Sequence, residues 1–202
     1  MTVAPPRVSS WNIANYLTVL RLALVPVFLV LLLGRDGEDP GWRIGAALVF
    51  ALASYTDRVD GQLARSRGLI TSFGKLADPI ADKALIGAAL IGLSLLDELP
   101  WWVTVLVLVR EVGVTLLRLF VIRHGVMPAS RGGKLKTVLQ GLAIGLYLLP
   151  LTGLLATGRA GVMALAVVVT VVTGVDYVVR ALTLRRTSAR AEMKRERKAR
   201  RG

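Results

Sequence analysis

The sequence predicts an all-α, polytopic membrane protein that crosses the bilayer six times. Of its 202 residues 54% are hydrophobic, and the mean hydropathy is +0.60, which is too apolar for an ordinary soluble domain. The apolar residues also gather into six runs, each close to the ~20 residues that one helical crossing requires. Cysteine is absent, so disulfides and thiolate metal sites are excluded.

The expected helices follow from these runs and from the polar links between them. They are placed at about residues 15–33, 42–64, 76–96, 101–122, 137–155 and 160–184. The second is expected to project from the bilayer into a water-filled site, because few residues separate its start at Trp42 from Asp57. Close helix–helix contacts are expected at four glycines, Gly87, Gly92, Gly141 and Gly145. Residues 1–184 are interpreted as one catalytic membrane domain, and residues 185–202 as a basic tail.

The distribution of charge predicts the orientation in the membrane. The formal net charge is +13, and residues 185–202 hold nine Lys or Arg and two Glu. The connections rich in Arg and Lys are residues 57–75 and 123–136, whereas those at 34–41, 97–100 and 156–160 carry acidic or few charges. The positive-inside rule therefore places both termini and the 57–75 connection in the cytoplasm, in a multi-pass protein of the inner (plasma) membrane. The basic tail favours an anionic lipid surface over nucleic acid, because no base-reading pattern accompanies it.

Four aspartates stand out in the apolar chain: Asp57, Asp60, Asp78 and Asp82. The first two are three residues apart and the last two are four apart, so each pair shares one face of a helix. Two carboxylates ~4 Å apart repel each other by ~4 kcal/mol at an effective dielectric constant near 20. Such a cluster needs either raised pKa values or a bound cation, and its all-oxygen chemistry favours Mg²⁺ or Mn²⁺, as one or two ions. Solvated loop aspartates and the ion site of a cation transporter are the alternatives.

The stretch from Asp57 to Asp82 resembles the signature of the CDP-alcohol phosphatidyltransferase family. The pattern Asp-x2-Asp-Gly-x2-Ala-Arg-x8-Gly-x3-Asp-x3-Asp matches at every fixed position. The resemblance implies the CDP-alcohol phosphotransferase fold and an integral membrane enzyme that moves a phosphatidyl group from a CDP-linked donor to an alcohol and releases CMP. It also implies that the four aspartates hold the metal, with Asp82 as the base that accepts the proton of the alcohol. The residues implied for donor binding are Asp60, Gly61, Ala64, Arg65 and Gly74.

Three further groups of polar residues suggest where an acceptor would bind. Thr18 and Arg21 lie within one helical turn, and helix capping with a snorkelling arginine is the alternative. An apolar run is interrupted by Arg110, Glu111 and Arg118. These residues are interpreted either as a buried ion pair or as an acceptor-phosphate site. Lys134 and Lys136 follow two glycines at an expected helix start, which suits an anion site, although the residues alone favour an ordinary basic loop.

These three segments resemble one branch of the family, the phosphatidylglycerophosphate synthases, although Ala14 replaces the proline that is usual there. The resemblance implies CDP-diacylglycerol as donor, glycerol-3-phosphate as acceptor and a homodimer in the lipid bilayer. The residues expected to bind the acceptor phosphate are Arg118, Lys134, Lys136, Arg110, Arg21 and Thr18. The same chemistry with another acceptor, as in a cardiolipin synthase or a phosphatidylinositol-type synthase, remains an alternative.

Overall fold

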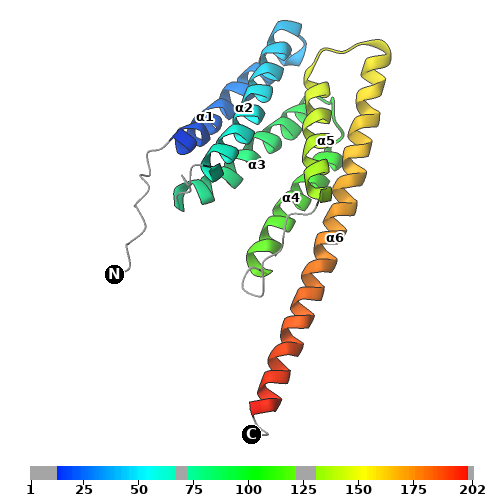
Figure 1. Ribbon diagram of the computed structural model, residues 1–202. Coiled ribbons are helices and arrows are strands. Elements are labelled where there is room, and N and C mark those ends of the chain that lie inside the picture. Colours follow the sequence, from blue (N-terminus) through cyan, green and yellow to red (C-terminus); the bar gives the residue numbers. More distant parts are fainter. Residues whose placement is uncertain (1–12, 67–71, 122–130, 200–202) are drawn as a thin grey trace.

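The computed structural model describes residues 13–66, 72–121 and 131–199. Within these ranges, the side chains of residues 13–15, 58–66, 72–79, 82, 118–121, 131 and 185–199 lie outside the description. The described chain consists of helices and short connections and contains no strand, which confirms the all-α class (Figure 1). The helices are α1 (Ile13–Leu33), η1 (Gly34–Gly37), α2 (Pro40–Ser66), α3 (Ser72–Leu95), α4 (Trp101–Val121), α5 (Arg131–Leu148) and α6 (Gly153–Ala199).

Two of these helices are long and apolar enough to cross a membrane, within Tyr16–Gly37 and Gly153–Leu184 of the described residues. The expectation of six spans is therefore not confirmed as it stands. The reason is physical: α2 carries Arg43 and Asp57, and α4 carries Arg110 and Glu111, so that neither is uniformly apolar. Such helices cross a bilayer only where their charges are paired or face a polar site.

Helix α5 begins earlier and ends earlier than the sequence predicts. Its first residue is Arg131 rather than residue 137, because hydropathy marks the apolar part of a helix and misses its polar first turn. The expected link at residues 156–160 is also wrong, since the chain turns at residues 149–152. Leu149 and Leu151 hide this turn in an apolar run, whereas Pro150 lacks an amide hydrogen and ends the helix there.

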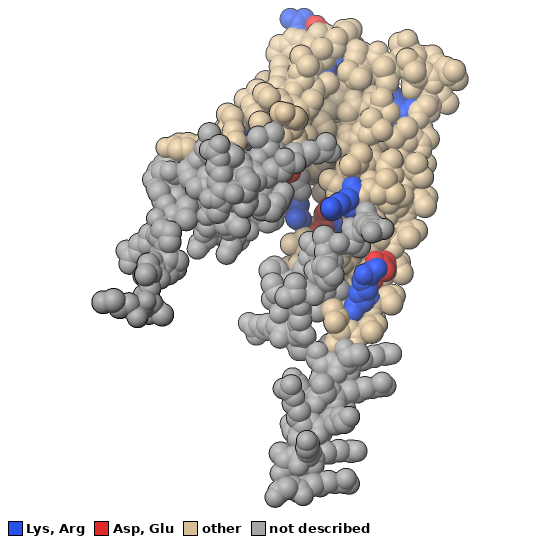
Figure 2. Space-filling view, viewed as in Figure 1, with Lys and Arg blue, Asp and Glu red and all other residues tan. Residues whose placement is uncertain are grey.

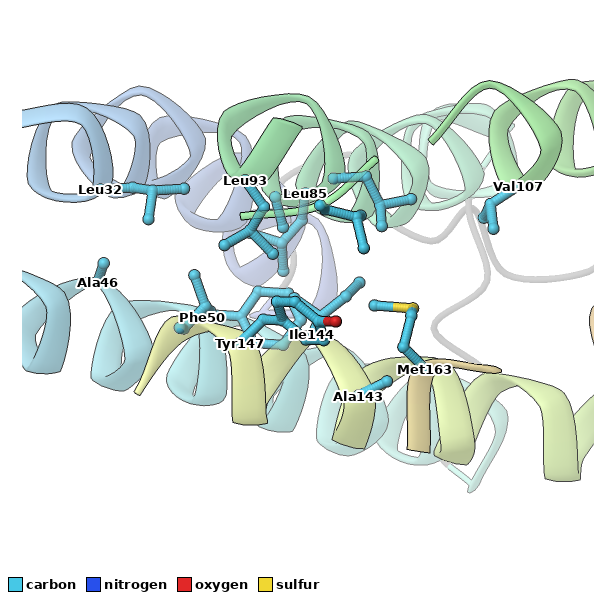
Figure 3. Packing of buried hydrophobic residues seen from close by; sticks show 14 of the residues in the cluster. Leu32, Ala46, Phe50, Leu85, Leu93, Val107, Ala143, Ile144, Tyr147 and Met163 are labelled. Atoms are coloured by element: carbon cyan, nitrogen blue, oxygen red, sulfur yellow. The ribbon is translucent and has the colours of Figure 1, made fainter. Parts of the chain in front are cut away.

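The helices pack as two groups that meet through α5 and through a contact between α3 and α4. Helix α1 packs against α2 and α3, helices α4 and α5 pack against α6, and α5 also contacts α2 and α3. Figure 3 shows Leu32, Leu85 and Leu93 facing Phe50 and Ile144 across the core. Helices α1 and α3 approach so closely that a Cβ atom added at Gly92 would lie 2.6 Å from Leu32 Cδ2, which confirms the expected contact at this glycine. No atom lies within 4 Å of such a position at Gly141 or Gly145, so the expectation is wrong for these two.

Arg43, Glu98 and Arg159, here called the Arg43 cluster, hold one end of the bundle together. Arg43 donates to the backbone carbonyls of Tyr147 and Leu148 and pairs with Glu98, and its side chain is buried. Glu98 Oε2 also forms an ion pair with Arg159 Nη2 at 2.5 Å. The Arg159 guanidinium carbon lies 4.6 Å from the centroid of the Tyr147 ring. The cluster therefore satisfies the last carbonyls of α5 and ties them to α2, to the α3–α4 turn and to α6.

Candidate functional site

Asp57, the first of the four aspartates, is paired with Arg21 across the α1–α2 contact. Arg21 Nη1 lies 2.6 Å from Asp57 Oδ1, and the side chain of Arg21 is 0% exposed whereas that of Asp57 is 38% exposed. Thr18 lies one turn before Arg21 on α1 and is also buried. The structure thus brings these three expected site residues together. It contradicts the snorkelling alternative for Arg21, whose charged head is not exposed.

The other aspartates lie on helices whose adjoining ends face the 67–71 connection. Asp60 belongs to the last turns of α2, and Asp78 and Asp82 belong to the first turns of α3, which packs against α2. The side chains of these three residues lie outside the described part of the chain, as do those of the remaining expected residues Gly61, Ala64, Arg65, Gly74 and Arg118. Among the side chains that are described, no group of three or more His, Cys, Asp or Glu is found.

Arg110, Glu111 and Lys136 form a second charged group, here called the ionic triad. Glu111 Oε1 accepts hydrogen bonds from Arg110 Nη1 at 3.0 Å and from Lys136 Nζ. The side chains of Arg110, Glu111 and Lys136 are 13%, 19% and 6% exposed. Figure 2 shows Lys and Arg atoms beside Asp and Glu atoms in a hollow near the middle of the view. The triad carries two positive charges for one negative charge, so it holds one net positive charge where little water can reach it.

Helix α6 fixes the orientation of Arg110. Arg110 Nη2 donates to Thr173 Oγ1 at 3.0 Å, and the guanidinium carbon lies 5.9 Å from the centroid of the Tyr177 ring. The triad therefore joins α4, α5 and α6 through hydrogen bonds. The buried ion pair that was one of the two interpretations of Arg110 and Glu111 is present. The sequence did not indicate that its partners on the other helices are Lys136, Thr173 and Tyr177.

Lys134 and Lys136 have different surroundings although they are two residues apart. Lys134 is exposed in the first turn of α5, whereas Lys136 is buried in the triad. Positions two apart on a helix do not face the same side, so one helix start offers one lysine to solvent and one to the interior. The expectation that the glycines and lysines lie at a helix N-terminus is confirmed, because α5 begins at Arg131.

An apolar groove of about 490 Å³ runs between α2 and α5. Its lining residues are Ile44, Ala47, Leu48, Phe50, Ala51, Ser54, Tyr55, Val138, Gly141, Leu142, Gly145, Leu146 and Leu149. Because Ser54 and Tyr55 line it together with Val138, Asp57 of α2 lies at about the same depth in the bundle as Lys136 of α5. This groove was not expected from the sequence, although two glycines four residues apart on α5, Gly141 and Gly145, are a signal that could have indicated it.

A helical bundle with carboxylates at the adjoining ends of two helices and buried cations at the same depth suits the handling of phosphorylated substrates at a membrane. The chain belongs to the CDP-alcohol phosphatidyltransferase family, whose family model matches residues 11–172. This match includes the four aspartates and the ionic triad.

Several relatives within this family have been given particular names. A Mycobacterium tuberculosis protein named "Probable phosphatidylglycerophosphate synthase" is 61% identical over 171 residues, which cover 85% of this chain and 82% of the relative. A Bacillus subtilis "CDP-diacylglycerol--glycerol-3-phosphate 3-phosphatidyltransferase" is 41% identical over 149 residues, or 69% of this chain and 77% of the relative. A Streptomyces coelicolor "Cardiolipin synthase (CMP-forming)" is 38% identical over 160 residues, or 78% and 71%. Membership of this family does not favour a cation transporter.

Proposed function

We propose that this protein transfers the phosphatidyl group of CDP-diacylglycerol to glycerol-3-phosphate, which gives phosphatidylglycerophosphate and releases CMP. The observation that carries the proposal is the 61% identity to a relative named for this product, over 85% of the chain. The complete aspartate signature between Asp57 and Asp82 supports the same chemistry.

The four aspartates would hold one or two Mg²⁺ or Mn²⁺ ions at the ends of α2 and α3. Four carboxylates suit a hard divalent ion. Asp57 is paired with Arg21 but remains partly exposed, so this pairing leaves room for a metal ion at its side chain. When bound, the metal neutralises the pyrophosphate of the donor and the developing charge on CMP. Gly61 and Ala64 would let the cytidylate approach closely, and Arg65 and Gly74 would contact the donor.

In the transfer step, a hydroxyl oxygen of glycerol-3-phosphate attacks the phosphorus atom that carries the diacylglycerol. The bond from this phosphorus to the CMP oxygen breaks, and Asp82 would accept the proton of the attacking hydroxyl. A carboxylate beside cations is a weak base, so the orientation of the hydroxyl would contribute much of the rate.

The α2–α5 groove supports a place for an acyl chain of the donor. Along α2 the groove is lined mainly by apolar side chains, and the last α2 residue that lines it is Tyr55, two residues before Asp57. An acyl chain in this groove would therefore leave its phosphate near the aspartates. The burial of methylene groups would stabilise it by ~0.8 kcal/mol each.

The acceptor phosphate would lie beside the ionic triad and the start of α5. Lys136 and Arg110 both contact Glu111 in the triad, and Lys134 adds a further cation in the first turn of α5. Arg118 is seven residues after Glu111 on α4, a spacing that suits the same face of a helix. Arg21 and Thr18 are weaker candidates, because Arg21 is held by Asp57.

The placement in the membrane belongs to the same proposal. Six spans, cytoplasmic termini and an active site at the cytoplasmic face of the inner membrane follow from the positions of the Arg- and Lys-rich connections. A homodimer follows from the family resemblance, and crosslinking in membranes would test it.

An acceptor panel tests the proposed reaction. Membranes containing the protein are incubated with CDP-diacylglycerol and, in turn, glycerol-3-phosphate, phosphatidylglycerol or an inositol phosphate, and lipid products are identified by mass. We expect CMP release and product with glycerol-3-phosphate alone, loss of both with a chelator, and recovery with Mg²⁺ or Mn²⁺. Product with phosphatidylglycerol instead would support the activity named for the Streptomyces relative, and no product with any acceptor would contradict the proposal.

A further inference from the structure

Gln140 is a buried amide whose hydrogen-bonding groups are not used within the described chain. Its side chain lies on the inner face of α5, one turn after Lys136, and the residue is 3% exposed. Neither Oε1 nor Nε2 has a hydrogen-bond partner among the residues that the structure describes. Leaving such a group unsatisfied costs about tenfold to a hundredfold in an equilibrium constant, so a polar ligand at this position would be bound favourably.

Thr170 of α6 is also buried with an unsatisfied polar group, at about the depth of Gln140 in the bundle. It is 1% exposed, and its hydroxyl has no hydrogen-bond partner among the described residues. Thr170 lies three residues before Thr173, the partner of Arg110, and Gln140 lies four residues after Lys136. Since α5 runs into the bundle and the adjacent α6 runs out of it, both residues lie ~4–6 Å deeper than the ionic triad.

The chemistry of this deeper layer differs from that of the triad. Arg110 and Lys136 are cations that suit a phosphate, whereas Gln140 and Thr170 are uncharged and each can donate as well as accept a hydrogen bond. A hydroxyl group also donates and accepts, so it complements them better than an anion or an alkyl group does.

We propose that Gln140, assisted by Thr170, binds the secondary hydroxyl of the acceptor and makes the enzyme specific for a glycerol phosphate over its deoxy analogue. This inference rests on the proposed function. The secondary hydroxyl lies on the carbon between the phosphate-bearing carbon and the carbon of the attacking hydroxyl. With the phosphate at the triad and the attacking hydroxyl near Asp57, which lies at about the depth of Lys136, a middle hydroxyl turned toward the interior of the bundle would lie on the Gln140 side.

The test compares two acceptors that differ by this one hydroxyl. Glycerol-3-phosphate and 3-hydroxypropyl phosphate both have the phosphate and the attacking primary hydroxyl. We expect the wild-type protein to prefer glycerol-3-phosphate at least 100-fold in kcat/KM, because the deoxy analogue leaves the buried amide unsatisfied. We expect Gln140→Leu to lower this ratio at least tenfold, by lowering kcat/KM for glycerol-3-phosphate.

Two further variants keep the test decisive. Thr170→Val removes a hydroxyl at nearly constant volume and is expected to lower the ratio as well, and it decides the matter if Gln140→Leu does not fold. Ser94→Ala removes a buried hydrogen bond of 2.7 Å to Thr104, on α3 and α4, and is expected to leave the ratio unchanged.

The failures of the two proposals are distinguishable. If the wild-type protein transfers to neither acceptor, the proposed function fails and the inference fails with it. The inference alone is overturned if the wild-type protein uses both acceptors with nearly equal kcat/KM. It is also overturned if Gln140→Leu and Thr170→Val lower kcat/KM equally for the two acceptors.

Discussion

Glu111 decides how much positive charge the interior of the bundle carries. The same carboxylate oxygen, Oε1, accepts hydrogen bonds from Arg110 and Lys136. The charges of these three side chains add up to one positive charge. Without this carboxylate, two cations would face each other in a poorly solvated space. Glu111 therefore orders the lysine and the arginine that would meet the acceptor phosphate.

Replacing Glu111 by glutamine should weaken both the fold and the use of the acceptor. Removing one partner of a mostly buried ion pair costs about 2–3 kcal/mol, which lowers Tm by about 4–12 °C for a chain of this size. We expect KM for glycerol-3-phosphate to rise at least fivefold and KM for CDP-diacylglycerol to change less than twofold. Thermal unfolding and steady-state kinetics measure the two effects.

Asp176→Asn is the matched control for this substitution. Asp176 and Arg180 form an ion pair at 2.9 Å on α6, and both side chains are substantially exposed. Its loss should cost less than about 0.5 kcal/mol and should leave both KM values unchanged. Equal effects of the two substitutions would show that the triad has no particular connection with the acceptor.

The sequence could predict which polar residues matter but not how they pair. Arg21 and Asp57 were both expected in the site, yet their contact depends on how α1 crosses α2 and not on any spacing along the chain. Gln140 was not among the residues expected in the site, because burial without a partner is a property of the packed bundle. For Asp60, Asp78 and Asp82 the expected metal site stays a prediction.

At the scale of the elements, α5 is the helix on which the proposed substrate sites converge. One side of it lines the apolar groove with Gly141 and Gly145, and its inner side presents Lys136 and Gln140. Donor and acceptor would therefore be held by opposite sides of one helix. A substitution on either side should affect one substrate more than the other.

Gly145→Leu should obstruct the groove without disturbing the fold. No atom lies within 4 Å of the added Cβ position, and leucine is a better helix former than glycine by up to ~1 kcal/mol. We expect KM for CDP-diacylglycerol to rise at least fivefold, while KM for glycerol-3-phosphate changes less than twofold. Steady-state kinetics in mixed micelles measure this difference.

Gly161→Leu is the control on α6, because its added Cβ also has no atom within 4 Å and Gly161 does not line the groove. It should leave KM for both substrates unchanged. If the two leucine variants raised the donor KM to the same extent, the groove would not be the place of the acyl chain.

The existence of the helices could be predicted from hydropathy, but both ends of α5 and the start of α6 could not. Apolar runs mark the parts of helices that face lipid or the core, and these indicated α1 to α4 correctly. The turn at residues 149–152 lies within such a run, and the polar start of α5 lies outside one. Hydropathy records the surroundings of a residue rather than its backbone conformation, so it fails where the two differ.

At the scale of the whole molecule, α6 extends well beyond the other helices. It has 47 residues, which corresponds to ~70 Å at 1.5 Å per residue, and it projects past the rest of the bundle toward the C-terminus (Figure 1). The apolar part reaches Leu184, and the basic residues that follow continue the same helix to Ala199. The helix therefore carries much of the positive charge of the chain away from the site.

Removal of residues 185–202 should change the response to lipid charge more than the catalytic rate. These residues hold nine Lys or Arg and two Glu, and each basic residue near an anionic surface contributes about 1 kcal/mol of attraction. In neutral micelles we expect the truncated protein to keep kcat within twofold. Activity with increasing anionic phospholipid should rise less than for the full chain, and an identical rise would contradict a role of the tail at the lipid surface.

The Arg43 cluster has a mechanical consequence. It fastens four elements at the end of the bundle remote from the aspartates, through carbonyl and carboxylate contacts that would all have to break for those elements to separate there. Entry and exit of bulky lipids require helices to part somewhere. The helices would then separate about a hinge at the Arg43 cluster, and the displacement would be largest at the opposite ends of the helices, near the aspartates.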